Sequence, residues 1–339
     1  MKSMRILLWT FLLTGLWAST ITRVGTTAAP FLKIGVGARA LGMGEAVVTQ
    51  TTDVSSMFWN PAGLGFMKKP QAIMNHYEMF AGLDYDYMGV AFPSRSMGTI
   101  GFNFTHYGGD DIERTTEYEQ EGTGELVSYG FFSVGISYAR ALTDRFSIGC
   151  NTKYVKEKIW HMSDNGFAVD VGIYYRTLFR NVTIGMNMAN FGTSMQLMGR
   201  DVLVQHDTNG LVNGDPDDIN AYLATDEFNL PIYFRVGISA NLGRDFLQLE
   251  GQDIILAIDA VHPNDNSEYV NAGLEYRLMD MVSIRTGHRM LFLDDAEGGF
   301  TIGGGLNLQV AGFGLELDYA AVDFGILGNT HKYTLILSF

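Results

Sequence analysis

The sequence has few of the features that tie an exported protein together covalently or anchor it in a membrane by a helix. It contains one cysteine, Cys150, which excludes an internal disulfide. Beyond the first residues there is no run of about 18 uncharged apolar residues, so we expect no transmembrane helix. Basic residues are also scarce, with 23 Lys and Arg against 37 Asp and Glu, and this balance argues against nucleic-acid partners.

Residues 1–29 have the pattern of a secretory signal peptide. Lys2 and Arg5 precede the apolar stretch Ile6 to Trp17, which is too short to span a bilayer. Small residues at Ala18-Ser19 and at Ala28-Ala29 place the predicted cleavage between residues 18 and 29. An exported chain that is 47% hydrophobic and lacks a membrane helix is then either a soluble secreted protein or a β-barrel.

Alternation of apolar residues with period two favours the barrel. Forty Gly, 16 Tyr and 22 Phe against only seven Pro suit many strands joined by short turns. From Gln71 onward the alternation predicts an all-β fold, a membrane-spanning antiparallel barrel of about fourteen strands. The predicted strands are 71–78, 84–92, 97–106, 128–140, 144–157, 166–176, 181–191, 231–241, 253–261, 268–278, 281–290, 299–308, 313–323 and 331–339.

The predicted connections differ in length between the two sides of the sheet. One side has two long loops, 107–127 and 192–230, each with seven acidic residues against one arginine. The other side has mostly tight turns, with 242–252 as the long exception, where a miscount would change the strand number by two. Long external loops and short periplasmic turns are typical of outer-membrane barrels, so we expect the chain to lie in the lipid of the bacterial outer membrane.

The stretch before the first strand lacks this alternation. Residues 30–70 are rich in glycine, and residues 71–339 form the predicted barrel, whose lumen is too wide for wall side chains to fill. We therefore predict that residues 30–70 form an N-terminal hatch or plug, whose glycines let its backbone pack against the wall. A dinucleotide loop is excluded, because no βαβ unit surrounds these glycines.

No cluster in the sequence predicts an enzyme, a metal site or a cofactor. The acidic run 215–218 offers oxygen ligands, but it lacks the spacing of a calcium loop, and a solvated acidic loop is the favoured interpretation. The seven histidines fall in or near the predicted outer loops. We interpret them as unrelated surface residues; the alternative is a metal-binding or pH-sensitive rim. No nucleophile has a recognisable partner base. Charged residues on the predicted lumen face, including Arg285, Glu275 and Asp318, are expected to pair across the interior or with the plug. Alternatively, they line a polar path through the barrel.

Two motifs in the predicted plug carry a family resemblance. The first is Gly37-Ala38-Arg39-Ala40-Leu41-Gly42-Met43-Gly44-Glu45-Ala46, and the second is Phe58-Trp59-Asn60-Pro61-Ala62-Gly63-Leu64. Together they resemble the N-terminal signature of the PorV/PorQ family, within the wider group of FadL-like fourteen-stranded outer-membrane proteins. The C-terminal pattern Tyr333, Leu335, Leu337 and Phe339 resembles the signal that the barrel-assembly machinery reads.

The resemblance implies two functions. PorV and PorQ proteins act with the type IX secretion system, so the first is assistance in protein export or surface attachment, with secretion-system or cargo proteins as partners. The second is that of a FadL-like transporter or channel for hydrophobic small molecules, in which Arg39, Met43, Trp59 and Asn60 would shape the ligand path. In the first function the two acidic loops would be the contact surfaces.

Overall fold

The computed structural model describes residues 24–206, 219–294, 296, 298–310 and 312–339. Most of the predicted signal peptide and the whole acidic run 215–218 lie outside the described residues. Across the described ranges no helix is long and apolar enough to cross a bilayer.

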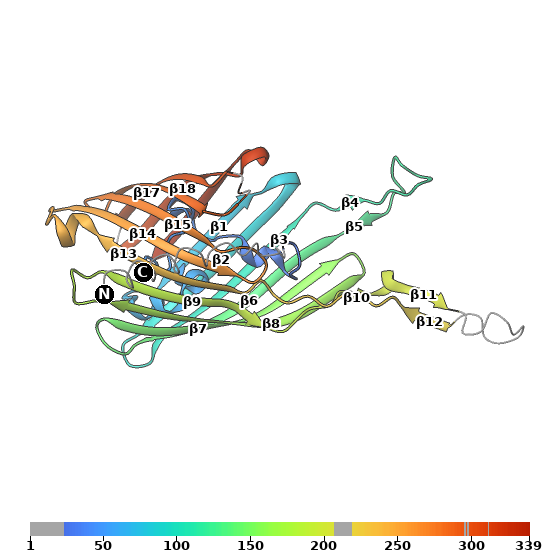
Figure 1. Ribbon diagram of the computed structural model, residues 1–339, viewed down its shortest axis with the longest axis horizontal. Helices are drawn as coiled ribbons and strands as arrows, with labels where there is room; N and C mark the ends of the chain where they lie inside the picture. The colour runs from blue at the N-terminus through green and yellow to red at the C-terminus, as the bar shows by residue number, and fades with distance from the viewer. Residues whose placement is uncertain (1–23, 207–218, 295, 297, 311) are drawn as a thin grey trace, which may run out of the picture.

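Fourteen strands form a closed antiparallel barrel (Figure 1). Each strand pairs with its neighbours in chain order, and the ring closes where β1 pairs with β19, with Ile73 opposite Ile336. The wall strands are β1 (Gln71–Glu78), β2 (Leu83–Ser94), β3 (Gly98–Gly109), β6 (Tyr129–Ala141), β7 (Phe146–Ile159), β8 (Met162–Arg176), β9 (Thr183–Gly192), β13 (Tyr233–Asn241), β14 (Gln252–Pro263), β15 (Tyr269–Leu278), β16 (Val282–Leu291), β17 (Phe300–Val310), β18 (Phe313–Asp323) and β19 (Asn329–Ser338). The predicted fold class and strand number are confirmed.

The wall follows the alternation seen in the sequence. In β19, Tyr333 and Leu337 are 61% and 40% exposed, whereas Lys332 and Thr334, on either side of Tyr333, are buried. In β18, Leu317 and Tyr319 likewise face outward and Asp318 faces the interior. An apolar outer face with a polar inner face is the arrangement of a barrel surrounded by lipid.

The two ends of the barrel differ. At one end, here called the hairpin end, the two long connections project from the wall (Figure 1). The opposite end, here called the turn end, has mostly short connections. The exception joins β13 to β14; it contains a single turn of π-helix, η5 (Leu242–Phe246), and no additional described strand.

The long connections contain secondary structure that the prediction of plain loops missed. In the first, β4 (Ile112–Glu113) pairs with β5 (Leu126–Val127). In the second, β11 (Leu203–His206) pairs with β12 (Ile219–Tyr222), and β10 (Met198–Gly199) pairs with β8. The apolar positions in these strands are too few to show a period in the sequence, which is why the pairs were not predicted.

Residues 30–67 lie inside the barrel as a chain of short helices (Figure 1). These are η1 (Pro30–Lys33), α2 (Ala38–Gly42), α3 (Ser56–Trp59) and η2 (Pro61–Phe66). Three further single turns, η3 (Phe80–Gly82), η4 (Arg200–Val202) and η6 (Gly325–Leu327), lie in connections at the hairpin end. The interior helices pack on inward-facing tyrosines of β1 and β2, Tyr77, Tyr85 and Tyr87, so the core of the molecule fills the lumen.

Candidate functional site

The candidate site is the contact between the interior segment, residues 30–70, and the barrel wall. Its helices are too short to be stable alone, so their positions depend on what the wall offers. Residues near Lys33 lie at the hairpin end, where Lys33 Nζ is 2.6 Å from Asp265 Oδ2 in the β14–β15 connection. Residue 70 lies at the turn end, where Phe339 N donates to Pro70 O at 3.1 Å, an ordinary length for a backbone hydrogen bond. The segment therefore runs through the length of the lumen.

Glycines in the first motif let the backbone of the segment touch the wall. A Cβ at Gly42 would lie 3.2 Å from Gly303 Cα in β17. At Gly44, φ is +62°, and a Cβ would lie 2.6 Å from the backbone nitrogen of His288. Only glycine satisfies both the left-handed backbone and this close approach. Met43, between them, is fully buried.

The second motif builds a buried corner that joins α3 to η2. Trp59 is fully buried, and its Nε1 donates to Val36 O at 2.7 Å. Asn60 caps η2 by accepting from Ala62 N at 3.2 Å, while its Nδ2 donates to Ile173 O of β8 at 3.1 Å. Pro61 occupies the first turn of η2, where no backbone donor is needed. The Asn-Pro pair thus both starts a helix and fastens it to the wall.

Gly63, next in this motif, is equally constrained. Its Cβ position is occupied by the carbonyl oxygen of Thr51, so any side chain here would displace the loop before α3. Arg235 of β13 stacks on the ring of Trp59 from the wall side, with its guanidinium carbon 5.3 Å from the ring centre.

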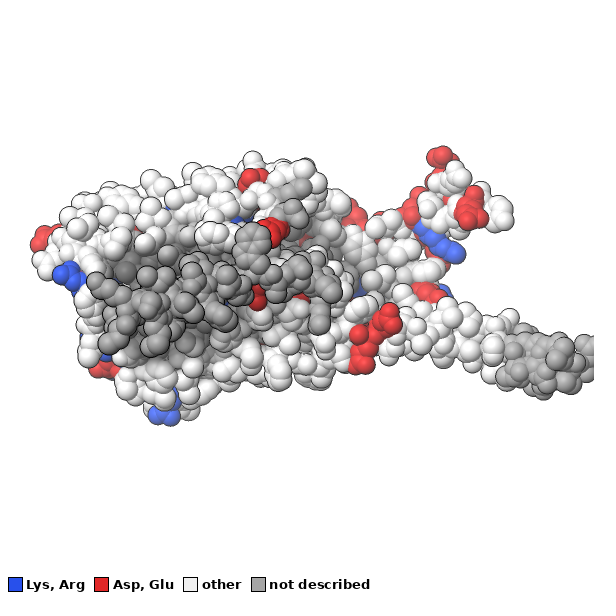
Figure 2. All heavy atoms as spheres, in the orientation of Figure 1, with Lys and Arg blue, Asp and Glu red and all other residues white. Residues whose placement is uncertain are grey.

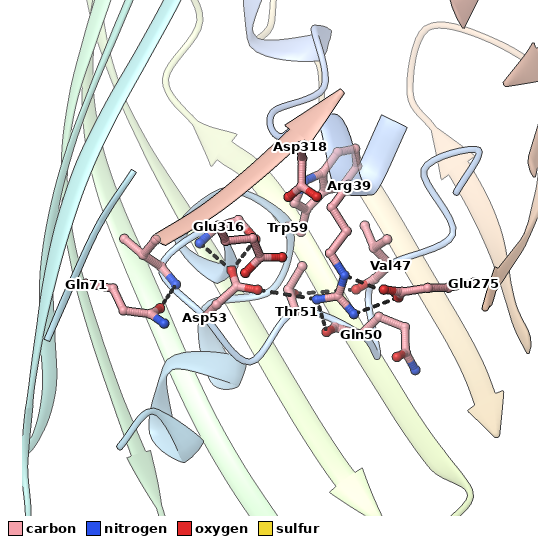
Figure 3. A network of polar contacts seen from close by, with 12 residues as sticks. Arg39, Val47, Gln50, Thr51, Asp53, Trp59, Gln71, Glu275, Glu316 and Asp318 are labelled. Carbon is pink, nitrogen blue, oxygen red and sulfur yellow. Dashed lines mark hydrogen bonds and ion pairs between the residues drawn. The ribbon is translucent and has the colours of Figure 1, made fainter. Parts of the chain in front are cut away.

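Arg39 is the charged centre of the site (Figure 3). Its Nη2 lies 3.0 Å from Glu275 Oε2 of β15, and its Nη1 lies 3.5 Å from Asp53 Oδ2 of the interior segment. The same Nη1 donates to Gln50 O at 3.4 Å. Burial by itself would lower the pKa of Arg39, but the carboxylates of Glu275 and Asp53 outweigh it and raise that pKa, so the guanidinium stays charged.

Glu275 extends this network along the wall. Besides Arg39, its carboxylate contacts Arg277 at 2.8 Å and Arg285 at 3.3 Å. Arg285 also pairs with Asp318 of β18. The prediction that charges of the lumen face pair with one another or with the plug is confirmed for Glu275, Arg285 and Asp318.

Backbone groups of the first motif supply further attachments. Gly37 N donates to Tyr77 OH at 2.6 Å, and Ala38 N donates to Thr334 Oγ1 at 2.7 Å. Glu45 pairs with Arg289 of β16 at 2.9 Å. The sequence analysis assigned no contact to Tyr77 or to Glu45 of the first motif. The alternation in the first predicted strand could have placed the side chain of Tyr77 on the lumen face.

The side chains of the predicted C-terminal assembly signal point away from this site. Tyr333, Leu335 and Leu337 share the outer face of β19, on the wall that faces lipid, and Phe339, directly after the strand, is also exposed. Near them an apolar groove of about 670 Å³ runs over the outer wall. Residues lining it include Met74, Leu306, Leu317, Tyr333 and Leu335.

The interior segment is held against the wall by ion pairs, hydrogen bonds and close backbone contacts. On the side of Arg39 that faces Asp53, a cavity of about 10 Å³ remains, which has room for about one water. Within the described residues no group of three or more His, Cys, Asp or Glu side chains is placed to hold a metal ion.

Acidic residues gather on the projecting β4–β5 hairpin, whereas the visible flank of the barrel is almost uncharged (Figure 2). The hairpin carries exposed carboxylates at Asp110, Asp111, Glu113, Glu117, Glu119, Glu121 and Glu125. Among them Tyr118 is 95% exposed and Ile112 and Leu126 are each 58% exposed. Apolar side chains ringed by charge on a projecting element are typical of a protein-binding surface.

Comparison with known proteins gives a family and a fold. The family model described as type IX secretion system protein PorV matches residues 18–246. No curated protein matches the chain. The solved toluene transporter TodX of Pseudomonas putida is similar with a TM-score of 0.56 and 12% identity, over 90% of this chain and 97% of that one. The Ralstonia pickettii toluene transporter TbuX gives a TM-score of 0.54 and 11% identity, over 90% and 97%. At these identities the transporters show the barrel fold alone.

Proposed function

This chain belongs to the PorV family of type IX secretion system proteins and lies in the bacterial outer membrane, and from this premise we propose how it acts in protein export. The projecting hairpins β4–β5 and β11–β12 bind secretion-system or cargo proteins, while the barrel holds them at the membrane surface. The observation that carries this proposal is the set of exposed apolar residues, Ile112, Tyr118 and Leu126, on the acidic β4–β5 hairpin.

The proposal also divides the chain into a signal peptide, a hatch and a barrel. Residues 1–29 are removed as a signal peptide, residues 30–70 act as a hatch, and residues 71–339 form the barrel. The ion pairs of Arg39 and Glu45 to the wall support a hatch that stays closed. The glycines and the Trp-Asn-Pro corner support it through close packing. N-terminal sequencing of the protein from outer membranes tests the first boundary, which we expect between residues 18 and 30.

Affinity purification from native outer membranes tests the binding role of the hairpins. We expect the full chain to co-purify secretion-system or exported proteins, and a variant with residues 114–125 replaced by a Gly-Ser turn to lose them. The matched control replaces the turn-end residues 95–97 and keeps the partners. Equal recovery of partners by the hairpin variant and the full chain would refute this role.

A second candidate function is transport of hydrophobic small molecules. The apolar groove over the outer wall favours it, because Met74, Leu317 and Leu335 offer a surface for an apolar ligand. Arg39, Met43, Trp59 and Asn60 would then have to move to open a path. Mass spectrometry of the purified protein decides between the two: a stoichiometric lipid-like molecule without protein partners supports transport.

A further inference from the structure

A second polar site lies at the turn end of the lumen. A cavity of about 200 Å³ opens between the ends of β8, β9, β13, β14 and β15. Four arginines line it, Arg39, Arg176, Arg244 and Arg277, and we call it the arginine pocket. A neighbouring cavity of about 410 Å³ shares Arg244, Asp253 and Arg277 with it and is also lined by Glu250 and Asp280.

The four arginines divide into two pairs. Arg39 and Arg277 already have carboxylate partners: both contact the buried Glu275, at 3.0 and 2.8 Å, Arg39 also lies 3.5 Å from Asp53, and Arg277 lies 3.9 Å from Asp280. Arg176 makes no ion pair among the described residues and lies over the ring of Phe66, 5.7 Å from its centre. Arg244 is 66% exposed and reaches Asp245 only at 3.7 Å. The second pair therefore retains donors for a ligand.

The carboxylates of the pocket already have partners. Asp245 accepts from Asn181 Nδ2 at 3.1 Å, and Asp253 accepts from Asn241 Nδ2 at 2.6 Å. These contacts leave the pocket lining with four positive and two negative side chains. Thr49, which is 99% buried and also lines the pocket, has a hydroxyl without a hydrogen-bond partner among the described residues.

We infer that the arginine pocket binds an oxyanion, a carboxylate or a phosphate group, that enters from the turn end. Arg176 and Arg244 hold the group by charge-assisted hydrogen bonds, for which the planar guanidinium is suited. Arg39 and Arg277 are fixed by Glu275 and form the inner wall of the pocket. The site is separate from the hairpins and does not depend on the role proposed for them.

Isothermal titration of the full-length protein in detergent tests the inference. The probes are inorganic phosphate, a short peptide with a free C-terminal carboxylate, and the same peptide as its C-terminal amide. We expect saturable binding of phosphate or of the acid peptide, weaker at high salt, and no binding of the amide. The variant R176Q/R244Q should bind about tenfold more weakly or not at all, because each arginine donates to a charged group.

The matched control is Arg95→Gln, an exposed arginine in the β2–β3 connection at the same end of the barrel, which should bind like the unaltered protein. Arg244→Gln alone serves if the double variant does not fold, because this exposed side chain is not needed for packing. Binding of phosphate alone or of the peptide alone supports the site and identifies the class of oxyanion. Absence of saturable binding, binding of the amide as tightly as the acid, or equal affinity in R176Q/R244Q would overturn the inference.

Discussion

Glu275 is the residue on which the charge balance of the lumen depends most. Its fully buried carboxylate contacts Arg39, Arg277 and Arg285 at 3.0, 2.8 and 3.3 Å. Removing one member of a buried ion cluster leaves the others without compensation, at a cost of about 3–5 kcal/mol. We expect Glu275→Gln to lower the free energy of unfolding by about this amount, measured by urea denaturation in lipid vesicles.

The control for this prediction is an ion pair on the surface. Arg114 and Glu125 of the hairpin lie 2.8 Å apart, but both side chains are more than 40% exposed. Arg114→Gln should therefore change the free energy of unfolding by no more than about 1 kcal/mol. If Glu275→Gln proves no more destabilising than Arg114→Gln, the buried network does not hold the interior segment.

For single residues, the sequence pointed to Arg39 and Glu275 but not to their contact with each other. Arg39 stands in a motif that resembles a family signature, and Glu275 falls on the polar face of its strand. Their contact spans 236 positions of the chain and depends on the register of β15 and on the path of α2, neither of which local patterns determine. The arginine pocket was not predicted for the same reason, since its residues come from separate strand ends.

Among the elements, η2 packs directly against the wall. A Cβ at Gly149 of β7 would lie 2.5 Å from the carbonyl carbon of Pro61 and 2.6 Å from Ala62 N. We expect Gly149→Ala to push η2 away, costing about 1–3 kcal/mol of stability as in an overpacked core. Faster proteolytic cleavage within residues 61–67 would report the displacement.

Gly130 of β6 provides the comparison, because a Cβ there would meet open space. Gly130→Ala carries the same change of backbone entropy without the clash and should leave both stability and proteolysis close to those of the unaltered protein. Equal proteolysis of the two variants would contradict tight packing of η2.

The last strand, β19, carries the predicted assembly signal. Phe339 is 48% exposed on the outer face, so its removal takes away little packing in the folded barrel. We expect deletion of Phe339 to reduce the amount of protein assembled in the outer membrane several-fold while leaving the thermal stability of the assembled fraction unchanged. Quantitative blotting of membrane fractions, together with heat-dependent gel mobility, measures both. An unchanged amount of assembled protein would show that the barrel-assembly machinery does not recognise Phe339.

The strands were predictable because lipid on one side and a polar lumen on the other impose a period of two on the residues of every wall strand. The interior helices were not predictable as elements, since four to six residues give no period, although their glycine content marked the segment as different. The short strand pairs of the long connections, β4–β5 and β11–β12, were missed for the same lack of length.

For the whole molecule, the closed barrel separates two regions with different tasks. The wall is covered by apolar side chains and stays in the lipid, and the lumen is filled by the interior segment. Acidic side chains gather on the β4–β5 hairpin, outside the wall (Figure 2), and Tyr118 of this hairpin is 95% exposed. This separation favours a protein that presents binding surfaces at the membrane over one that conducts solutes through an open lumen.

The central claim is that the protein assists export, and the distribution of exported proteins in a strain of the native host that lacks this chain tests it most directly. We predict that proteins normally found at the cell surface accumulate in the periplasm of that strain. Export should be restored by the full chain and not by the variant with residues 114–125 replaced. Normal surface levels of these proteins in the strain that lacks the chain would contradict the account.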